Sequence, residues 1–203
     1  MSTTQNVALK EIFDEHQLRH IAQQAAVVCP AFERERERFL SLVLHGLNEL
    51  SLMQRLRRTA QSLYAALPLQ YREAVGVLRL LAPRMQSKFA TLALPDFVGL
   101  YGLDDFDSST EALRFFTDFG LSEFAVRCFL RKDLHRALAI MQSWSLDGDA
   151  HVRRLASEVS SAPALAVPAG GPHARPVLER TDIAQPDGRP QRLRAQVGGQ
   201  PPQ

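Results

Sequence analysis

Two glutamates, Glu123 and Glu158, stand in two helical segments that share a short phrase of sequence. FAVR at residues 124–127 returns as HVRR at residues 151–154, so an aliphatic residue precedes an arginine in each segment. Carboxylates can stabilise a developing positive charge or orient a water molecule. A glutamate on a helix is more often an ordinary surface residue, so the two acids are candidates that need further support.

Basic side chains accompany both glutamates. Lysine and arginine suit contacts with phosphates, which position a protein on a nucleic acid without reading its sequence. The alternative is that these side chains are solvated or form salt bridges within the repeat. The candidates for phosphate binding are Arg127, Arg131, Lys132, Arg136, Arg153 and Arg154.

Composition argues against several other kinds of site. The formal net charge is only +2, so a nucleic-acid surface would have to be a local patch. Cys29 and Cys128 match no metal-binding spacing and are predicted to be reduced, buried thiols. The histidines also lack such spacing, and no glycine-rich phosphate loop appears. Without a signal peptide or a membrane-length apolar run, the sequence predicts a soluble, cytoplasmic protein.

Apolar residues recur at helical intervals over most of the chain. Amphipathic helices are predicted over residues 8–27, 51–66 and 69–82. Pro30 suits the first turn of a further helix that continues through ERERER to LSLVLHGL. Only a short helix is predicted around residues 95–101, because prolines and glycines interrupt that region.

Polar and glycine residues indicate where the later helices begin and end. Ser108 and Glu111 form a capping-box pattern, and Gly120 suits the C′ position of the same helix. Ser122 and Asp149 are placed to cap the two helices that follow. No alternating strand pattern occurs, so the sequence predicts an all-α fold of stacked helical repeats. A non-repeat helical bundle is the alternative, since both have the same period.

The composition changes sharply near residue 159. Residues 1–158 are formally neutral and contain every aromatic residue. Residues 159–203 hold eight of the twelve prolines and carry the whole charge excess. Such a segment buries too little apolar surface to offset its ordering entropy. The prediction is a folded domain over 5–158 and a disordered tail over 159–203.

The run LPDFVGLYGLDDFDSSTEALRFFTDFGLSEFAVRCFL, with DAHVRRLASE further on, resembles the DNA alkylation repair proteins. The similarity is to the AlkC/AlkD superfamily of HEAT-like repeat proteins, and within it to the AlkC branch. It covers roughly residues 5–158 and is most specific over 94–158. It implies an α-solenoid that wraps duplex DNA in its concave face.

The resemblance also implies an activity. Such proteins hydrolyse the glycosidic bond of N3-alkylated adenine and related cationic lesions, without a metal or organic cofactor. The family's motifs map the catalytic acids onto Glu123 and Glu158, and they favour Arg127, Arg153 and Arg154 as DNA contacts. The expected protein is a monomeric DNA-3-methyladenine glycosylase that acts on double-stranded DNA. The alternative is a non-catalytic helical-repeat module that binds DNA or protein.

The chemistry suits two carboxylates. An N3-alkylated purine is already a cation, so its departure needs little protonation. The barrier lies in the sugar, which gains oxocarbenium character as the base leaves. Acids near C1′ can stabilise this charge and orient the attacking water. A neutral base would be helped far less, which would explain selectivity for cationic lesions.

The sequence departs from the family pattern at two places. Cys128 stands where a proline is expected, and the glycine and RPRLPW-like run expected after Glu158 are lost. LRAQVGGQPPQ, at residues 193–203, is also what codons for YVRKSVANHLN give in another reading frame. That second sequence has the form of a further repeat helix. We therefore expect residues from about 159 onward to be out-of-frame translation of a longer repair gene.

A fold that stops at residue 158 has consequences for the last helix. It would leave Val152 and Leu155 without their next neighbour, at roughly 1.5–3 kcal/mol for each exposed side chain. Glu158 would lie at a fraying helix end. The expectation is weak DNA binding and little or no glycosylase activity.

Overall fold

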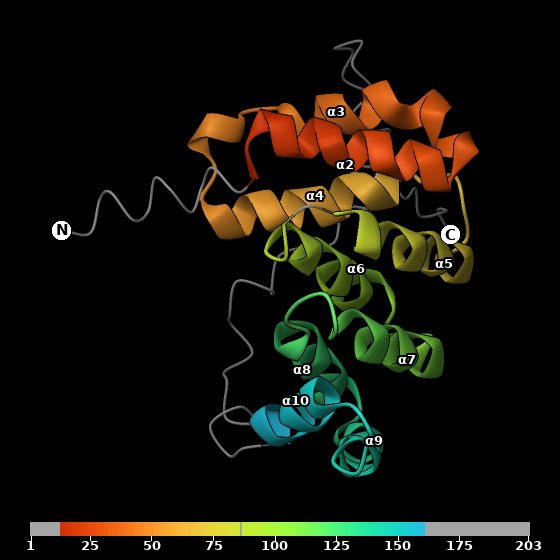
Figure 1. Ribbon diagram of the computed structural model, residues 1–203, viewed down its shortest axis with the longest axis vertical. Coiled ribbons are helices and arrows are strands. Elements are labelled where there is room, and N and C mark those ends of the chain that lie inside the picture. The colour runs from red at the N-terminus through yellow and green to blue at the C-terminus, as the bar shows by residue number, and fades with distance from the viewer. Residues whose placement is uncertain (1–12, 86, 161–203) are drawn as a thin grey trace, which may run out of the picture.

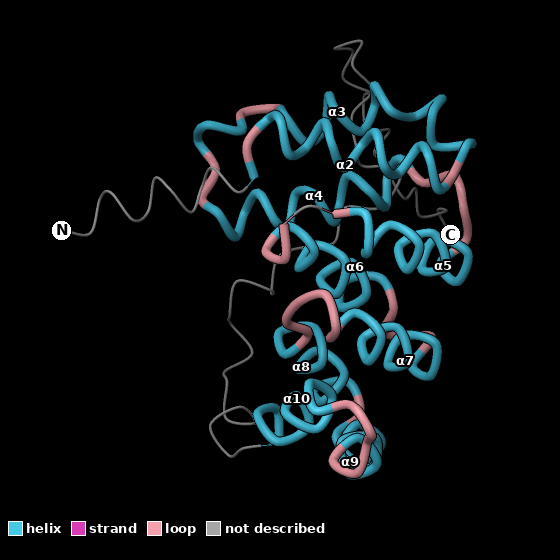
Figure 2. The backbone as a smooth tube through the Cα atoms, in the orientation of Figure 1, coloured by secondary structure: helices cyan, strands magenta, loops and turns pink. Residues whose placement is uncertain are grey.

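The computed structural model describes residues 13–85 and 87–160, and within these ranges the chain is helical, with no strand (Figures 1 and 2). The predicted all-α class is confirmed. The predicted start of the first helix and almost all of the predicted tail lie outside the described residues. The α-helices are α2 Glu15–Val28, α3 Arg36–Leu44, α4 Leu52–Ala66, α5 Tyr71–Leu81, α6 Ala93–Tyr101, α7 Phe106–Phe116, α8 Glu123–Lys132, α9 Leu134–Trp144 and α10 Ala150–Ser160.

The helices form two stacked columns (Figure 1). In one column, α4, α6, α8 and α10 pack on one another in succession. In the other, α5 packs on α7, and α9 lies on the same side of the molecule, packed against α8 and α10. The pair α2 and α3 covers the end formed by α4 and α5. Successive helix pairs thus repeat the same arrangement, as predicted for stacked repeats.

One core of apolar side chains runs through the stack from Phe13 to Val159. Val152 and Leu155 were expected to be exposed, and this expectation is wrong. Both are buried within the core, because α10 packs against α8 and α9. The helix also continues to Ser160, past the boundary predicted at residue 158.

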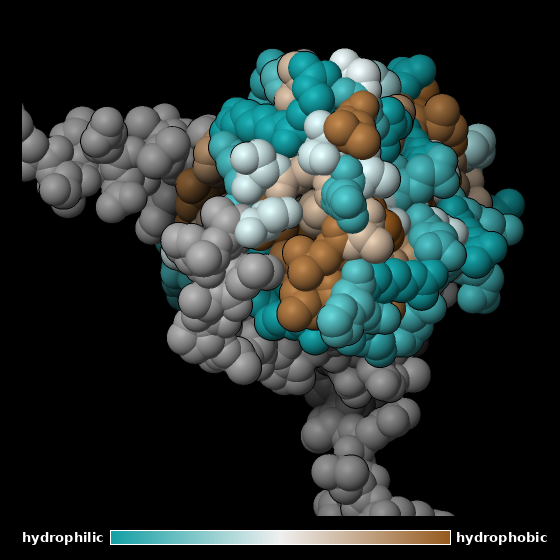
Figure 3. Space-filling model, turned by 90° about the horizontal axis from the view of Figure 1, so that it is seen from below, coloured by the Kyte–Doolittle hydropathy of each residue, from teal (hydrophilic) through white to brown (hydrophobic). Residues whose placement is uncertain are grey.

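The surface at the α9–α10 end is mostly hydrophilic, with hydrophobic side chains gathered near its middle (Figure 3). None of the described helices is long and apolar enough to cross a membrane. Cys29 is buried as predicted, whereas Cys128 is only partly buried, and both are free thiols.

The predicted capping box at Ser108 is wrong. Helix α7 begins at Phe106, and its N-cap is Asp105, three residues before Ser108. The Asp105 carboxylate forms an ion pair with Arg72 of α5. Asp105 therefore occupies the N-cap position and also contacts α5, whereas the sequence pattern had pointed to Ser108.

Gly120 and Ser122 lie at the predicted turn, but they act differently from the prediction. Gly46 alone among the described glycines has a positive φ, so Gly120 does not form a left-handed C-cap. A Cβ on Gly120 would lie 2.9 Å from Thr91 Oγ1, so the glycine allows a close approach between segments. Ser122 precedes α8, yet its hydroxyl donates to the Leu113 carbonyl at 3.1 Å and makes no cap bond. Asp149 does cap its helix, accepting from His151 N at 2.7 Å.

Candidate functional site

Glu123 is the first residue of α8, where a carboxylate is favoured by the helix dipole. Its side chain is nevertheless partly buried. The Oε2 atom is buried and accepts no hydrogen bond from a described residue. Burial raises the pKa of Glu123, and the neighbouring Glu158 carboxyl raises this pKa further.

Glu158 lies in the last turn of α10 and faces Glu123, because α10 packs on α8. Arg154, one turn earlier, donates from Nε to Glu158 Oε1 at 2.8 Å. The Arg154 guanidinium and, to a lesser degree, the Glu123 carboxyl hold the pKa of Glu158 below its usual range. The structure thus brings the two predicted acids together as a coupled pair, with the charge favoured on Glu158 and the proton on Glu123.

A small hollow opens beside this pair, between the α7–α8 turn and α10. Its volume is about 240 Å³, including the open space at its mouth. Polar groups prevail in the lining, and the Thr117 and Ser122 hydroxyls there are bound to the Leu113 carbonyl. The lining residues are Thr117, Gly120, Leu121, Ser122, Glu123, His151, Arg154 and Leu155.

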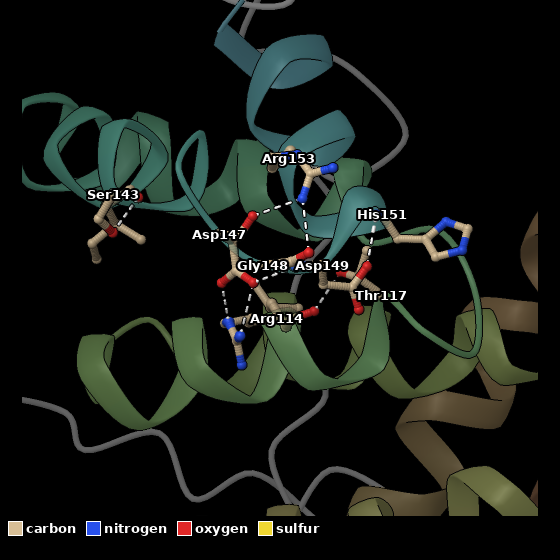
Figure 4. Close-up of polar contacts among 10 residues, drawn as sticks. Arg114, Thr117, Ser143, Asp147, Gly148, Asp149, His151 and Arg153 are labelled. Carbon is tan, nitrogen blue, oxygen red and sulfur yellow. Dashed lines mark hydrogen bonds and ion pairs between the residues drawn. The ribbon is translucent and has the colours of Figure 1, made fainter.

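His151 was not selected from the sequence as a site residue. It belongs to the recurring HVRR phrase, and this was the one feature of the sequence that could have marked it as a site residue. In Figure 4 its ring points away from the Asp147–Arg153 side of the turn. Its place in the hollow depends on how α10 packs, which no local pattern encodes.

Arg153 is hydrogen-bonded to the turn that precedes its own helix, α10 (Figure 4). Its Nη1 donates to the carbonyls of Asp147 and Gly148, each at 2.8 Å. The Asp147 carboxylate in turn accepts from Arg114 of α7 at 2.6 Å and 3.0 Å, which lowers the pKa of Asp147 to about 2. This network joins α7 to the α9–α10 turn, and it gives Arg153 a structural task.

The basic residues of α8 make fewer polar contacts with other protein groups. Arg127 packs over the Phe124 ring at 5.5 Å, and its Nε is buried without an acceptor among the described residues. Arg131 donates to Cys128 Sγ at 3.3 Å. Lys132 forms an ion pair with the exposed Asp104 at 3.1 Å.

Arg136 of α9 differs from these three. It pairs with Asp107 at 2.6 Å and lies over the Phe106 ring at 4.5 Å. The predicted cations therefore fall into two groups. Those of α8 make few polar contacts with other protein groups, and the others are already bound to protein carboxylates or carbonyls. No cluster of His, Cys, Asp or Glu in the described part of the chain could hold a metal ion.

Comparisons with known proteins agree with this architecture. No protein-family model matches the chain. The uncharacterized protein YhaZ of Bacillus subtilis (strain 168) is 41% identical over 153 residues, which cover 75% of this chain and 42% of YhaZ. The structure of Pseudomonas fluorescens alkylpurine DNA glycosylase AlkC, bound to DNA containing an abasic site analog, matches at 51% identity. Its TM-score is 0.71, over 74% of this chain and 42% of that one.

The fold is therefore that of a stacked helical-repeat protein, similar to the solved structure of AlkC. At this identity the resemblance to AlkC-type proteins is confirmed. The chain spans about two fifths of the length of both relatives.

Proposed function

We propose that this chain carries part of a DNA glycosylase site that releases cationic N3-alkylated purines, such as 3-methyladenine, from double-stranded DNA. The carboxyl pair of Glu123 and Glu158 carries the proposal, because it places two acids side by side, and Glu123 lines a hollow that is open to solvent. The similarity to a DNA-bound alkylpurine glycosylase supports it.

In the proposed reaction the bond between C1′ and the purine nitrogen breaks, and both electrons leave with the base. The alkylated purine is a cation, so it departs as a neutral molecule. The sugar is left with oxocarbenium character, and the negative charge centred on Glu158 stabilises it. Water then adds to C1′ and passes its proton to an ionised carboxylate of the pair.

The half-buried position of Glu123 favours the proton on that acid, so the ionised carboxylate of the pair is Glu158. A neutral base would leave as an anion and would gain little from a nearby carboxylate. The proposed site therefore favours cationic lesions.

Contacts to the DNA backbone are proposed for the basic side chains of α8. Arg127 and Arg131 have no carboxylate partner among the described residues, so a phosphate could bind them without breaking an ion pair. Lys132 could exchange its exposed partner Asp104 for a phosphate. Arg153 is a weaker candidate, because two carbonyls already occupy it.

The test is release of 3-methyladenine from methylated duplex DNA by an excess of the purified chain. Glu158→Gln should slow release by at least about 100-fold, as expected for removal of a transition-state charge. Glu123→Gln should slow release less, because it replaces the protonated acid of the pair with a neutral amide. Glu111→Gln, on the exposed face of α7, is the matched control and should keep the wild-type rate. A chain that binds DNA but releases no base would instead be a non-catalytic repeat module.

A further inference from the structure

The Arg154–Glu158 ion pair on the surface of α10 lies next to the Glu123 carboxyl and the hollow. Arg154 and Glu158 are one turn apart on α10, with Nε and Oε1 at 2.8 Å. Arg154 also lines the hollow together with Glu123. The buried Oε2 of Glu123 receives no donor from any described residue, including Arg154. Arg154 thus binds Glu158 and leaves Oε2 of Glu123 without a donor.

We propose that Arg154 is a positioning residue, which orients Glu158 and keeps it as the ionised member of the carboxyl pair, and that its main role is not a phosphate contact. The catalytic part of this inference rests on the proposed function. The arrangement itself can be tested without any reaction.

The asymmetry follows from where the cation lies. Two adjacent carboxyls cannot both ionise freely, so the pair retains one proton over a range of pH. A cation bonded to one member decides which of them holds the charge. Since Arg154 contacts Glu158, the proton stays with the more buried Glu123, in agreement with the raised pKa of Glu123 and the lowered pKa of Glu158.

Few other charges act on the pair. Among the described residues, the charged side chains that shift the pKa of either carboxyl are the two acids themselves and Arg154. His151 of α10 lines the same hollow. Asp118, which follows α7, interacts with Asp149 and His151 instead. No described residue of α6 or α9 is among the groups that shift either pKa. The pH response of the pair should therefore depend mainly on Arg154.

The first experiment is an NMR titration of the side-chain carboxyl carbons of Glu123 and Glu158 in the full chain. In Arg154→Gln both pKa values should rise, that of Glu158 more, and Arg154→Lys should restore part of the difference. Arg19→Gln is the matched control. Arg19 forms the same kind of exposed pair, with Glu15 at 2.6 Å, far from the site. An unchanged Glu158 titration in Arg154→Gln would overturn the proposal.

The second experiment separates positioning from DNA binding. Arg154→Gln should lower the excision rate at saturating DNA by about 10- to 100-fold, as expected for a misplaced catalytic group. DNA affinity and its salt dependence should stay unchanged, and the acidic limb of the pH–rate profile should move to higher pH. Weaker, less salt-dependent binding with an unchanged maximal rate would instead identify a phosphate contact. If the wild-type chain excises nothing, the proposed function fails, and the titration still decides the role of Arg154.

Discussion

Glu123 is a carboxyl whose ionised form is disfavoured by the fold. Its pKa is raised because burial removes water and Glu158 adds negative charge. A folded-state pKa above the unfolded one gives stability that is present below the unfolded pKa and is lost as pH rises through the folded value. At any pH high enough to ionise Glu123, this ionisation therefore works against folding. Such conflict between function and stability is common at active sites.

Glu123→Gln should consequently stabilise the chain at pH 8. The amide is neutral and can donate to Glu158, so we expect a gain of about 1 kcal/mol, reduced from the fully buried case because the side chain is half exposed. The gain should shrink at pH 4.5, where the wild-type carboxyl is more protonated. Urea unfolding at both pH values, with Glu111→Gln as control, measures it. A loss of stability at pH 8 would contradict the assignment of a strained carboxyl.

The sequence could identify the two acids, but it could not show which basic side chains already have a partner within the protein. Residue type, spacing and the family motif selected Glu123 and Glu158, and the structure places them together. Whether an arginine is available depends on groups far away in the sequence. Arg153 is held by the turn that Arg114 anchors, so its engagement could only be seen in three dimensions.

Arg153→Gln should accordingly act on stability and leave DNA binding largely intact. Loss of two carbonyl contacts loosens the α9–α10 turn, and a net loss of about 1–2 kcal/mol is expected. Thermal unfolding and the salt dependence of duplex binding should be measured together. A lower binding slope at unchanged stability would show that Arg153 contacts phosphate after all.

At the scale of the element, periodicity predicted helices well and their starting points less well. Segments 51–66 and 69–82 became α4 and α5 with shifts of one or two residues at most. The start of α7 was misplaced, because Asp105 and not Ser108 occupies the N-cap position. Close helix contacts were also invisible in the sequence. Gly102, at the end of α6, faces Tyr71 and Ser109, whose side chains are hydrogen-bonded at 2.6 Å.

Gly102→Ala should therefore destabilise the junction of α5, α6 and α7. A Cβ there would lie 2.1 Å from Tyr71 Oη and 2.4 Å from Ser109 Oγ, so the hydrogen bond must break or the helices must move. The expected loss is about 1–3 kcal/mol. Gly76→Ala is the matched control: nothing lies within 4 Å of its Cβ on α5, and helix propensity predicts a gain of up to about 1 kcal/mol. Equal effects of the two changes in urea unfolding would contradict this packing.

At the scale of the whole molecule, the folded part has no excess charge to attract DNA. Binding must then depend on where cations are concentrated and available, and α8 offers such a set. The formal net charge of +2 could not reveal this arrangement, because paired and unpaired cations count equally in a sum.

Arg131→Gln and Lys132→Gln should each weaken duplex binding and reduce the slope of log affinity against log salt by about 1. The reason is that each lost phosphate contact releases one fewer counterion. Fluorescence anisotropy across a salt series measures both quantities. Arg38→Gln on α3, which breaks a pair with Glu35 just before that helix, should change neither. A slope unaffected by both α8 changes would move the DNA surface elsewhere.

The carboxyl pair is divided between two helices, so it exists only while α10 is docked on α8. In a stacked architecture each helix is held mainly by its neighbours, and partial opening can require much less free energy than global unfolding. Undocking of α10 would expose Val152 and Leu155, return Glu123 to water and separate it from Glu158. The fraction of molecules with an assembled site is then an opening equilibrium, measurable by hydrogen exchange of the α10 amides. Any ligand that bridges α8 and α10 would shift this equilibrium toward the docked form.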